Sequence, residues 1–190
     1  MLDMLYSHMR SLAPIDDDVL SALDAHWGEV SFKRKDTITV EGNTEKYLYF
    51  VLDGVQRAFT VKNGKDATLI FSYKGSFSGV LDSFLLQEPS KYHLEALTSS
   101  KMLRLHHAVF IDVLHKHRAL ETWVRIALTR VLAGTLDRNI ELLSYSAEEK
   151  FKVLLKRSPQ VLNLIPHKYL ASYIGVDPTT FSKMLSTIKL

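Results

Sequence analysis

The sequence predicts an α+β fold, in which an antiparallel β jelly-roll barrel is followed by a long helix and a small helical domain. Three observations support this prediction. Short apolar runs with turn signals between them fill residues 30–105. A proline-free segment with helical periodicity spans residues 120–143, and the signals of two short helices lie within residues 165–188.

The composition is that of an ordinary globular protein, with 46% hydrophobic and 24% charged residues. The 190 residues include no cysteine, which excludes disulfides, thiolate metal sites and cysteine-ligated iron–sulfur clusters. No apolar run approaches the roughly 20 residues that span a bilayer. The first residues also lack the basic and then apolar order of a secretory signal. We therefore expect a cytoplasmic protein with no membrane partner.

Turn chemistry at close intervals indicates the barrel. The run from Tyr47 to Gly75 contains three strand-like stretches, separated at Asp53-Gly54 and at Asn63-Gly64. Asn-Gly supplies the positive φ angles that a type I′ turn requires, so the second and third stretches should form a tight hairpin. Further strand material follows at residues 93–105.

A helix is predicted from about residue 108 to residue 143, and it carries two apolar stripes. The first stripe contains Val124, Leu128, Leu132, Leu136, Ile140 and Leu143. The second stripe contains Leu120, Trp123, Ala127 and Val131, with Gly134 at its end. A helix that lies on its own domain needs only one stripe. We assign the second stripe to a homodimer interface; the alternative is a helix buried on both sides within one chain.

The C-terminal part is predicted to be a separate basic domain. Ser146 and Glu149 have the spacing of a capping box, so a new helix should begin there. We place the boundary at Ser144–Ser146, which gives domains of residues 1–146 and 147–190. The second domain contains seven Lys/Arg and three Asp/Glu, a net charge of +4. This surplus favours a polyanionic partner, although a solvated lysine face gives the same count.

Residues 165–188 carry the most specific pattern, that of a helix-turn-helix. Gly175 permits the left-handed turn that ends a first helix, and Asp177-Pro178 provides an N-cap and a first-turn proline for the second. The buried stripe of the second helix is Phe181, Met184, Leu185 and Ile188. Its exposed groups are Thr179, Thr180, Ser182, Lys183 and Ser186. These groups suit the base edges and phosphates of double-stranded DNA. The alternative is an ordinary helical hairpin.

With these elements in this order, the chain resembles the Crp–Fnr superfamily of bacterial transcription regulators, named for the cyclic-AMP receptor protein. The resemblance rests on three stretches, YFVLDGVQRAF, GSFSG and ASYIGVDPTTFSKML. It implies an effector in the barrel, a parallel dimer through the long helix, a palindromic operator and RNA polymerase as a further partner. The residues that it places at DNA are His167, Lys168, Pro178, Thr179, Thr180, Ser182, Lys183 and Ser186.

Two departures from the family concern DNA. Lys183 stands where the family usually has a base-contacting arginine, and lysine makes a point contact rather than a planar bidentate one. The sequence ends at Leu190, directly after the recognition helix, where the family commonly has a β-hairpin wing. We expect the wing to be reduced or absent, with fewer phosphate contacts and weaker salt dependence as the result.

A third departure concerns the effector pocket. The family's ribose-binding glutamate corresponds to Val80, and its phosphate-binding arginine falls on or near Ser90, followed by Lys91. Loss of one charge-assisted hydrogen bond typically costs about 1.5–3 kcal/mol, so cyclic nucleotide binding is disfavoured. The predicted pocket contains Gly75, Ser76, Ser78, Gly79, Val80, Ser90, Lys91, Tyr92 and His93. We expect a different small anionic effector, or no effector at all with glycines that serve only barrel turns.

An enzyme is disfavoured. His93, His106 and His107 lack the spacing of a metal-dependent cupin site, so no metal site is predicted. No nucleophile elbow, Walker loop or dinucleotide fingerprint is present. The remaining rivals are a ligand-independent regulator and a protein-interaction module that keeps the fold.

Overall fold

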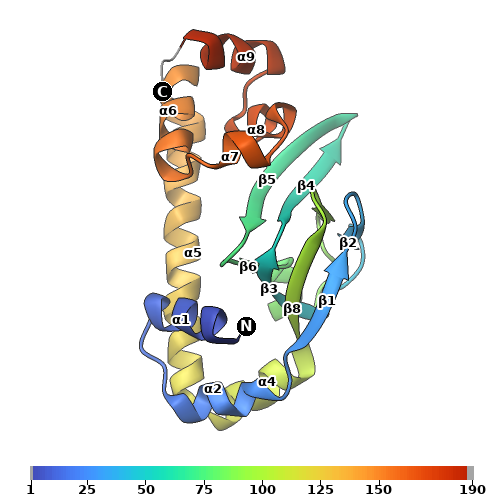
Figure 1. Cartoon of the computed structure of the whole chain (residues 1–190), viewed down its shortest axis with the longest axis vertical. Coiled ribbons are helices and arrows are strands. Elements are labelled where there is room, and N and C mark those ends of the chain that lie inside the picture. Colours follow the sequence, from blue (N-terminus) through green and yellow to red (C-terminus); the bar gives the residue numbers. More distant parts are fainter. Residues whose placement is uncertain (1, 188–190) are drawn as a thin grey trace.

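The computed structural model describes residues 2–187. Figure 1 shows one long helix, α5 (Arg118–Ser144), beside a barrel of strands. The N-terminal helices and the C-terminal helices lie at opposite ends of α5. Among the described residues, no helix is long and apolar enough to cross a membrane.

The barrel consists of two four-stranded antiparallel sheets, which confirms the predicted jelly roll. In order, the first sheet contains β1 (Gly28–Phe32), β8 (Ser100–His106), β3 (Tyr47–Asp53) and β6 (Phe77–Ser78). The second contains β2 (Thr37–Thr39), β7 (His93–Ala96), β4 (Val55–Lys62) and β5 (Lys65–Tyr73). The predicted hairpin joins β4 to β5, with φ angles of 53° at Asn63 and 73° at Gly64. Both turn residues are thus left-handed, as a type I′ turn requires.

Nine helices lie within residues 2–187. Besides α5 they are α1 (Leu2–Leu12), α2 (Asp17–Asp24), α3 (Leu81–Leu86), α4 (His107–Lys116), α6 (Ala147–Arg157), α7 (Val161–Leu164), α8 (His167–Ile174) and α9 (Pro178–Thr187). The predicted helix of about 108–143 is therefore two helices, α4 and α5. His117 separates them because its backbone is extended, with φ −126° and ψ 98°.

The end of α5 and the start of α6 follow the sequence signals. Ser146 caps α6 in a complete capping box with Glu149, as predicted. The Ser146 hydroxyl donates to the Glu149 carboxylate at 2.7 Å and the Ser146 backbone N–H at 2.8 Å, and these two hydrogen bonds lower the pKa of Glu149. The division into domains at Ser144–Ser146 stays a prediction.

Two cores support these elements. The larger core joins α1, α2, α4 and the first half of α5 to the first sheet, with Phe50 and Leu120 fully buried. The second core joins α6, α8 and α9, where Phe151 and Phe181 are fully buried, and it includes Val55 of the barrel. The helix-turn-helix thus shares its core with the barrel.

Candidate DNA-binding surface, effector loop and dimer face

The turn between α8 and α9 has the geometry that its sequence predicts. Gly175 is left-handed, with φ 69°, and an added Cβ would lie 3.3 Å from the Leu142 side chain of α5. Asp177 caps α9 by accepting a hydrogen bond of 2.9 Å from the backbone N–H of Thr180. On the inner face of α9, the Phe181 ring meets the Phe151 ring edge-on at 5.2 Å. These contacts fix the orientation of α9.

The outer face of α9 is polar and exposed. Thr179, Ser182, Lys183 and Ser186 are exposed, and Lys183 forms no ion pair with any described residue. The hydroxyl of Thr180 instead donates to Asp177, and this bonding lowers the pKa of the Asp177 carboxyl. The remaining predicted DNA contacts, His167, Lys168 and Pro178, are also exposed. Ile188 lies outside the described residues.

In the first part of the predicted effector pocket, residues 75–79, Ser76 and the glycines serve the turns of the chain. Ser76 accepts from the backbone N–H of Tyr73 at 3.1 Å and donates to its carbonyl at 2.7 Å, which closes the turn after β5. Gly75 and Gly79 have φ angles of 85° and 123°, so they serve turns. The buried hydroxyl of Ser78 has no hydrogen-bond partner among the described residues.

Apolar side chains surround Val80, the residue that the resemblance places at the ribose-binding position. Val80 is fully buried and packs with Ala58 and Leu94, while Tyr92 covers this cluster. The Tyr92 hydroxyl donates to Asp82 at 2.6 Å. Ser90 is buried and its hydroxyl donates to the Tyr92 carbonyl. Neither group is free for a phosphate.

Of the remaining residues predicted for this pocket, Lys91 is exposed and His93 is half-buried. His93 pairs in register with Phe59 and stacks on its ring at 5.1 Å, and its Nδ1 accepts from the backbone N–H of Glu41 at 3.2 Å. Because the neighbouring Leu94 points into the buried cluster, strand alternation places His93 on the outer face of the barrel. Lys91 is exposed and forms no ion pair within the described part of the chain. His93 is therefore removed from the predicted pocket.

The predicted dimer stripe of α5 also requires a correction. Leu120 is fully buried, and Trp123 is buried with its indole N–H donating to the Met9 carbonyl at 2.8 Å. Both residues belong to the chain's own core because α1 covers this part of the helix, and Ala127 packs against the same core. Only Val131 and Gly134 of the predicted interface are exposed. From residue 128 to the end of α5, the large apolar side chains that are exposed are Leu128, Val131, Leu132, Leu136, Ile140, Leu142 and Leu143.

A network that the sequence did not indicate joins the helix-turn-helix to the barrel. Arg57 of β4 is buried, and its guanidinium binds Asp66 bidentately, with two contacts of 2.7 Å, and also Glu95. The ring of Tyr169, from α8, covers the same guanidinium at 3.8 Å. The hydroxyl of Ser172 accepts from the backbone N–H of Thr68 at 2.9 Å. We call Arg57, Asp66, Glu95, Tyr169 and Ser172 the interdomain network.

Comparisons with known proteins agree with this architecture. Residues 29–117 match the family model of the cyclic nucleotide-binding domain. The chain is similar to FixK2 from Bradyrhizobium japonicum at 16% identity, with a TM-score of 0.71 over 84% of this chain and 83% of that one. It is similar to the Catabolite Activator Protein of Thermus thermophilus at 22% identity, with a TM-score of 0.58 over 94% and 84% of the two chains.

A third similar structure is limited to one domain. The N-terminal domain of a transcriptional regulator from Streptomyces coelicolor A3(2) is 27% identical, with a TM-score of 0.54 over 70% of this chain and 92% of that one. No curated protein matches the sequence. The likenesses establish a barrel, long helix and C-terminal helices in a shared arrangement.

Proposed function

The chain has the fold of the Crp–Fnr superfamily, with a cyclic nucleotide-binding domain at residues 29–117, and on this premise we propose that it is a homodimeric DNA-binding transcription regulator. One observation carries the proposal. The helix α9 is fixed by the buried Phe181 and by the Asp177 cap, while its polar outer face is unobstructed. A recognition helix needs this combination in order to enter the major groove.

The dimer in this proposal forms through the second half of α5. Leu132, Leu136 and Leu143 are 59%, 54% and 79% exposed, which is unusual for large apolar side chains on one helix. A second copy of α5 would cover them. Two recognition helices related by a two-fold axis then require a palindromic operator.

We further propose that the barrel does not respond to cyclic nucleotides. Val80 offers no hydrogen-bond acceptor for a ribose hydroxyl, and Ser90 is bonded to its own loop. A regulator without an effector and a protein-interaction module are the alternatives that experiments must separate from this proposal.

The first experiment selects binding sites from random duplexes with the full chain, followed by fluorescence anisotropy on the selected and scrambled duplexes. We expect a palindrome and an affinity that falls as the salt concentration rises. Lys183→Ala should lose about 1–3 kcal/mol on the selected site if Lys183 contacts a base, and less on the scrambled one. Lys74→Ala, at an exposed lysine between β5 and β6, is the matched control and should leave both unchanged. Absence of binding to any duplex at low salt would favour the protein-interaction module.

The second experiment is calorimetric titration of the chain with cyclic AMP and with cyclic GMP. We expect no heat of binding at micromolar concentrations, because the two anchoring groups are replaced. Saturable micromolar binding would show that other groups, such as Lys91, take over the phosphate, and it would contradict the effector part of the proposal without touching the DNA-binding part.

A further inference from the structure

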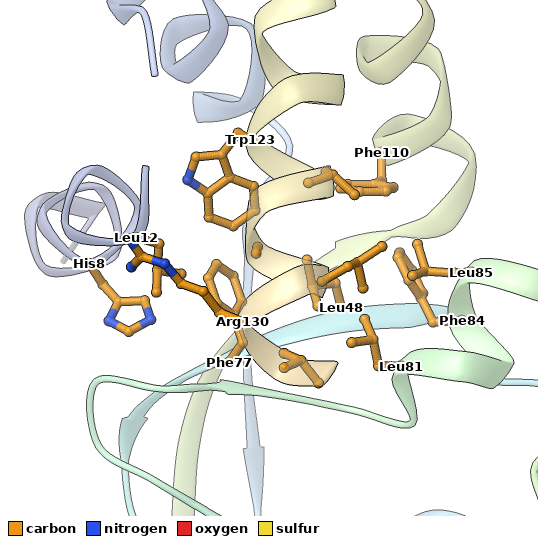
Figure 2. Close-up of a pocket in the computed structure, with 14 residues that line it drawn as sticks. His8, Leu12, Leu48, Phe77, Leu81, Phe84, Leu85, Phe110, Trp123 and Arg130 are labelled. Atoms are coloured by element: carbon orange, nitrogen blue, oxygen red, sulfur yellow. The ribbon is translucent and has the colours of Figure 1, made fainter. Parts of the chain in front are cut away.

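A cavity of about 350 Å³ lies between α1, the barrel and the first half of α5. This volume falls within the roughly 300–1,000 Å³ range of small-molecule sites. Figure 2 shows that aromatic and aliphatic side chains from α3, α4, α5 and β6 surround it. The principal apolar residues are Phe77, Leu81, Phe84, Leu85, Phe110 and Trp123. The main body of the cavity is therefore suited to an apolar ligand.

One end of the cavity carries a cation. Figure 2 shows the guanidinium nitrogens of Arg130 beside Leu12 and His8, away from Phe84 and Leu85. The only hydrogen bond that Arg130 makes with the described residues runs to the Ser11 carbonyl at 3.3 Å, and no carboxylate among them forms an ion pair with it. Burial lowers the pKa of His8, so His8 is neutral near pH 7. Arg130 thus supplies the positive charge.

Around Val80, by contrast, side chains of the chain itself fill the barrel interior. Val80, Ala58 and Leu94 are between 0% and 1% exposed and pack against one another. Leu81 and Leu85, which lie on α3 directly after Val80, line the cavity of Figure 2. Residues 80–85 therefore fill the position that the resemblance gives to the nucleotide pocket, and they also line a second space beside α5.

We propose that this cavity binds an amphipathic monocarboxylate, a molecule with one anionic head and an apolar body of the kind found in medium-chain fatty acids. The body would displace water from the aromatic walls, and the carboxylate would pair bidentately with Arg130. A nucleotide does not fit this lining, because its sugar and base require several polar partners. Arg130 is itself exposed, and Leu128 and Val131 on either side of it also line the cavity, so a second copy of α5 is the competing occupant that the experiments below separate from the ligand. The site goes beyond the proposed function, since binding there is independent of DNA.

Calorimetry with the full chain tests the site, with octanoate as the probe and 1-octanol as the uncharged probe of the same chain length. We expect one octanoate per chain, and a dissociation constant for 1-octanol at least tenfold higher. Arg130→Gln should weaken octanoate at least tenfold and leave 1-octanol unchanged. Arg125→Gln removes an exposed guanidinium from the same helix outside this lining, and it should change neither affinity.

A filling variant provides a second test. Ala127 lines the cavity, so Ala127→Leu should weaken both probes, with circular dichroism to confirm that the fold persists. Two results would overturn the proposal: no octanoate binding to the wild-type chain, or an equal loss in Arg125→Gln and Arg130→Gln. Binding that appears only in a monomeric variant would show that a second copy occupies the cavity, which also overturns it. None of these results depends on DNA binding, so failure here leaves the proposed function open to its own test.

Discussion

The two halves of α5 have similar apolar content but opposite environments. In the first half, Leu120 and Trp123 are 0% and 5% exposed, since α1 and the barrel cover them. In the second half, Leu132 and Leu136 are 59% and 54% exposed. The chain therefore provides its own partner for one half of the helix and leaves the other half for a second molecule. The apolar surface of a helix alone does not reveal which of these applies.

The largest effect should follow from removing the Trp123 side chain, which is buried in the first half of α5. Trp123→Ala deletes a buried indole and its hydrogen bond to Met9, and we expect a loss of about 3–5 kcal/mol in the free energy of unfolding. Urea denaturation at a dilution where the chain is monomeric provides the measurement. Leu143→Ala, at a side chain that is 79% exposed, should cost less than about 0.5 kcal/mol under the same conditions. If Trp123→Ala impairs dimerisation without a loss of folding stability, Trp123 belongs to the dimer interface after all.

The next effect concerns the second half. In the double variant Leu132→Glu and Leu136→Glu, carboxylates replace two exposed leucines, so a paired α5 would bring like charges together in an apolar seam. We expect the mass in solution, measured by analytical ultracentrifugation, to fall from twice 21.7 kDa to 21.7 kDa. The melting temperature of the diluted chain should change little, because neither side chain belongs to its core. A wild-type chain that is already monomeric would contradict the assignment.

A smaller effect is a pH dependence of the folding stability, caused by His8 on α1, the helix that covers the first half of α5. Burial lowers the pKa of His8 from its ordinary value of 6.5, so below that pH the unfolded chain binds a proton more readily than the folded chain does. Stability should therefore be complete above about pH 6.5 and decline as the pH falls further. His107 acts in the same direction, since burial and the neighbouring His106 lower its pKa. Melting temperatures of wild type and His8→Gln across this range give the measurement, and equal slopes would exclude a contribution from His8.

The smallest effect is that of Gly134→Ala, which should act differently on the single chain and on the dimer paired through α5. An added Cβ at Gly134 meets nothing within 4 Å in the single chain, so Gly134→Ala should stabilise the monomer by about 0.5–1 kcal/mol through helix propensity. If the paired helices approach each other closely at Gly134, the same change should weaken the dimer. Denaturation and ultracentrifugation on one sample separate the two results. Equal gains in the stability of the monomer and of the dimer would place the crossing point of the two α5 helices elsewhere.

Short-range signals predicted much of this fold because the physical cause lies within a few residues. The left-handed Asn63 and Gly64, the Ser146 capping box and the Asp177 cap each depend on groups no more than three residues apart. Such features are encoded locally, so the sequence alone was sufficient for them.

Contacts between residues far apart in the chain could not be predicted from the sequence in the same way. The indole of Trp123 bonds to a carbonyl 114 residues away, and no periodicity shows that α1 rather than a second chain meets that face. Similarly, the side of the barrel that His93 occupies depends on its register with Phe59 on another strand. Arg57 belongs to the stretch YFVLDGVQRAF, yet no local pattern in the sequence indicates its ion pairs or its contact with Tyr169.

The interdomain network has a consequence for protein engineering. Regulators that appear modular can be used to build chimaeric proteins, in which the sensory domain of one protein is fused to the DNA-binding domain of another protein. A fusion made after Ser146 would remove the Tyr169 ring and the Ser172 hydroxyl, leaving one face of the Arg57 guanidinium and the backbone N–H of Thr68 without their partners. A graft that carries tyrosine and serine at these two positions should be better tolerated than one that does not. In this chain, a transferable C-terminal module includes the barrel surface on which α8 packs.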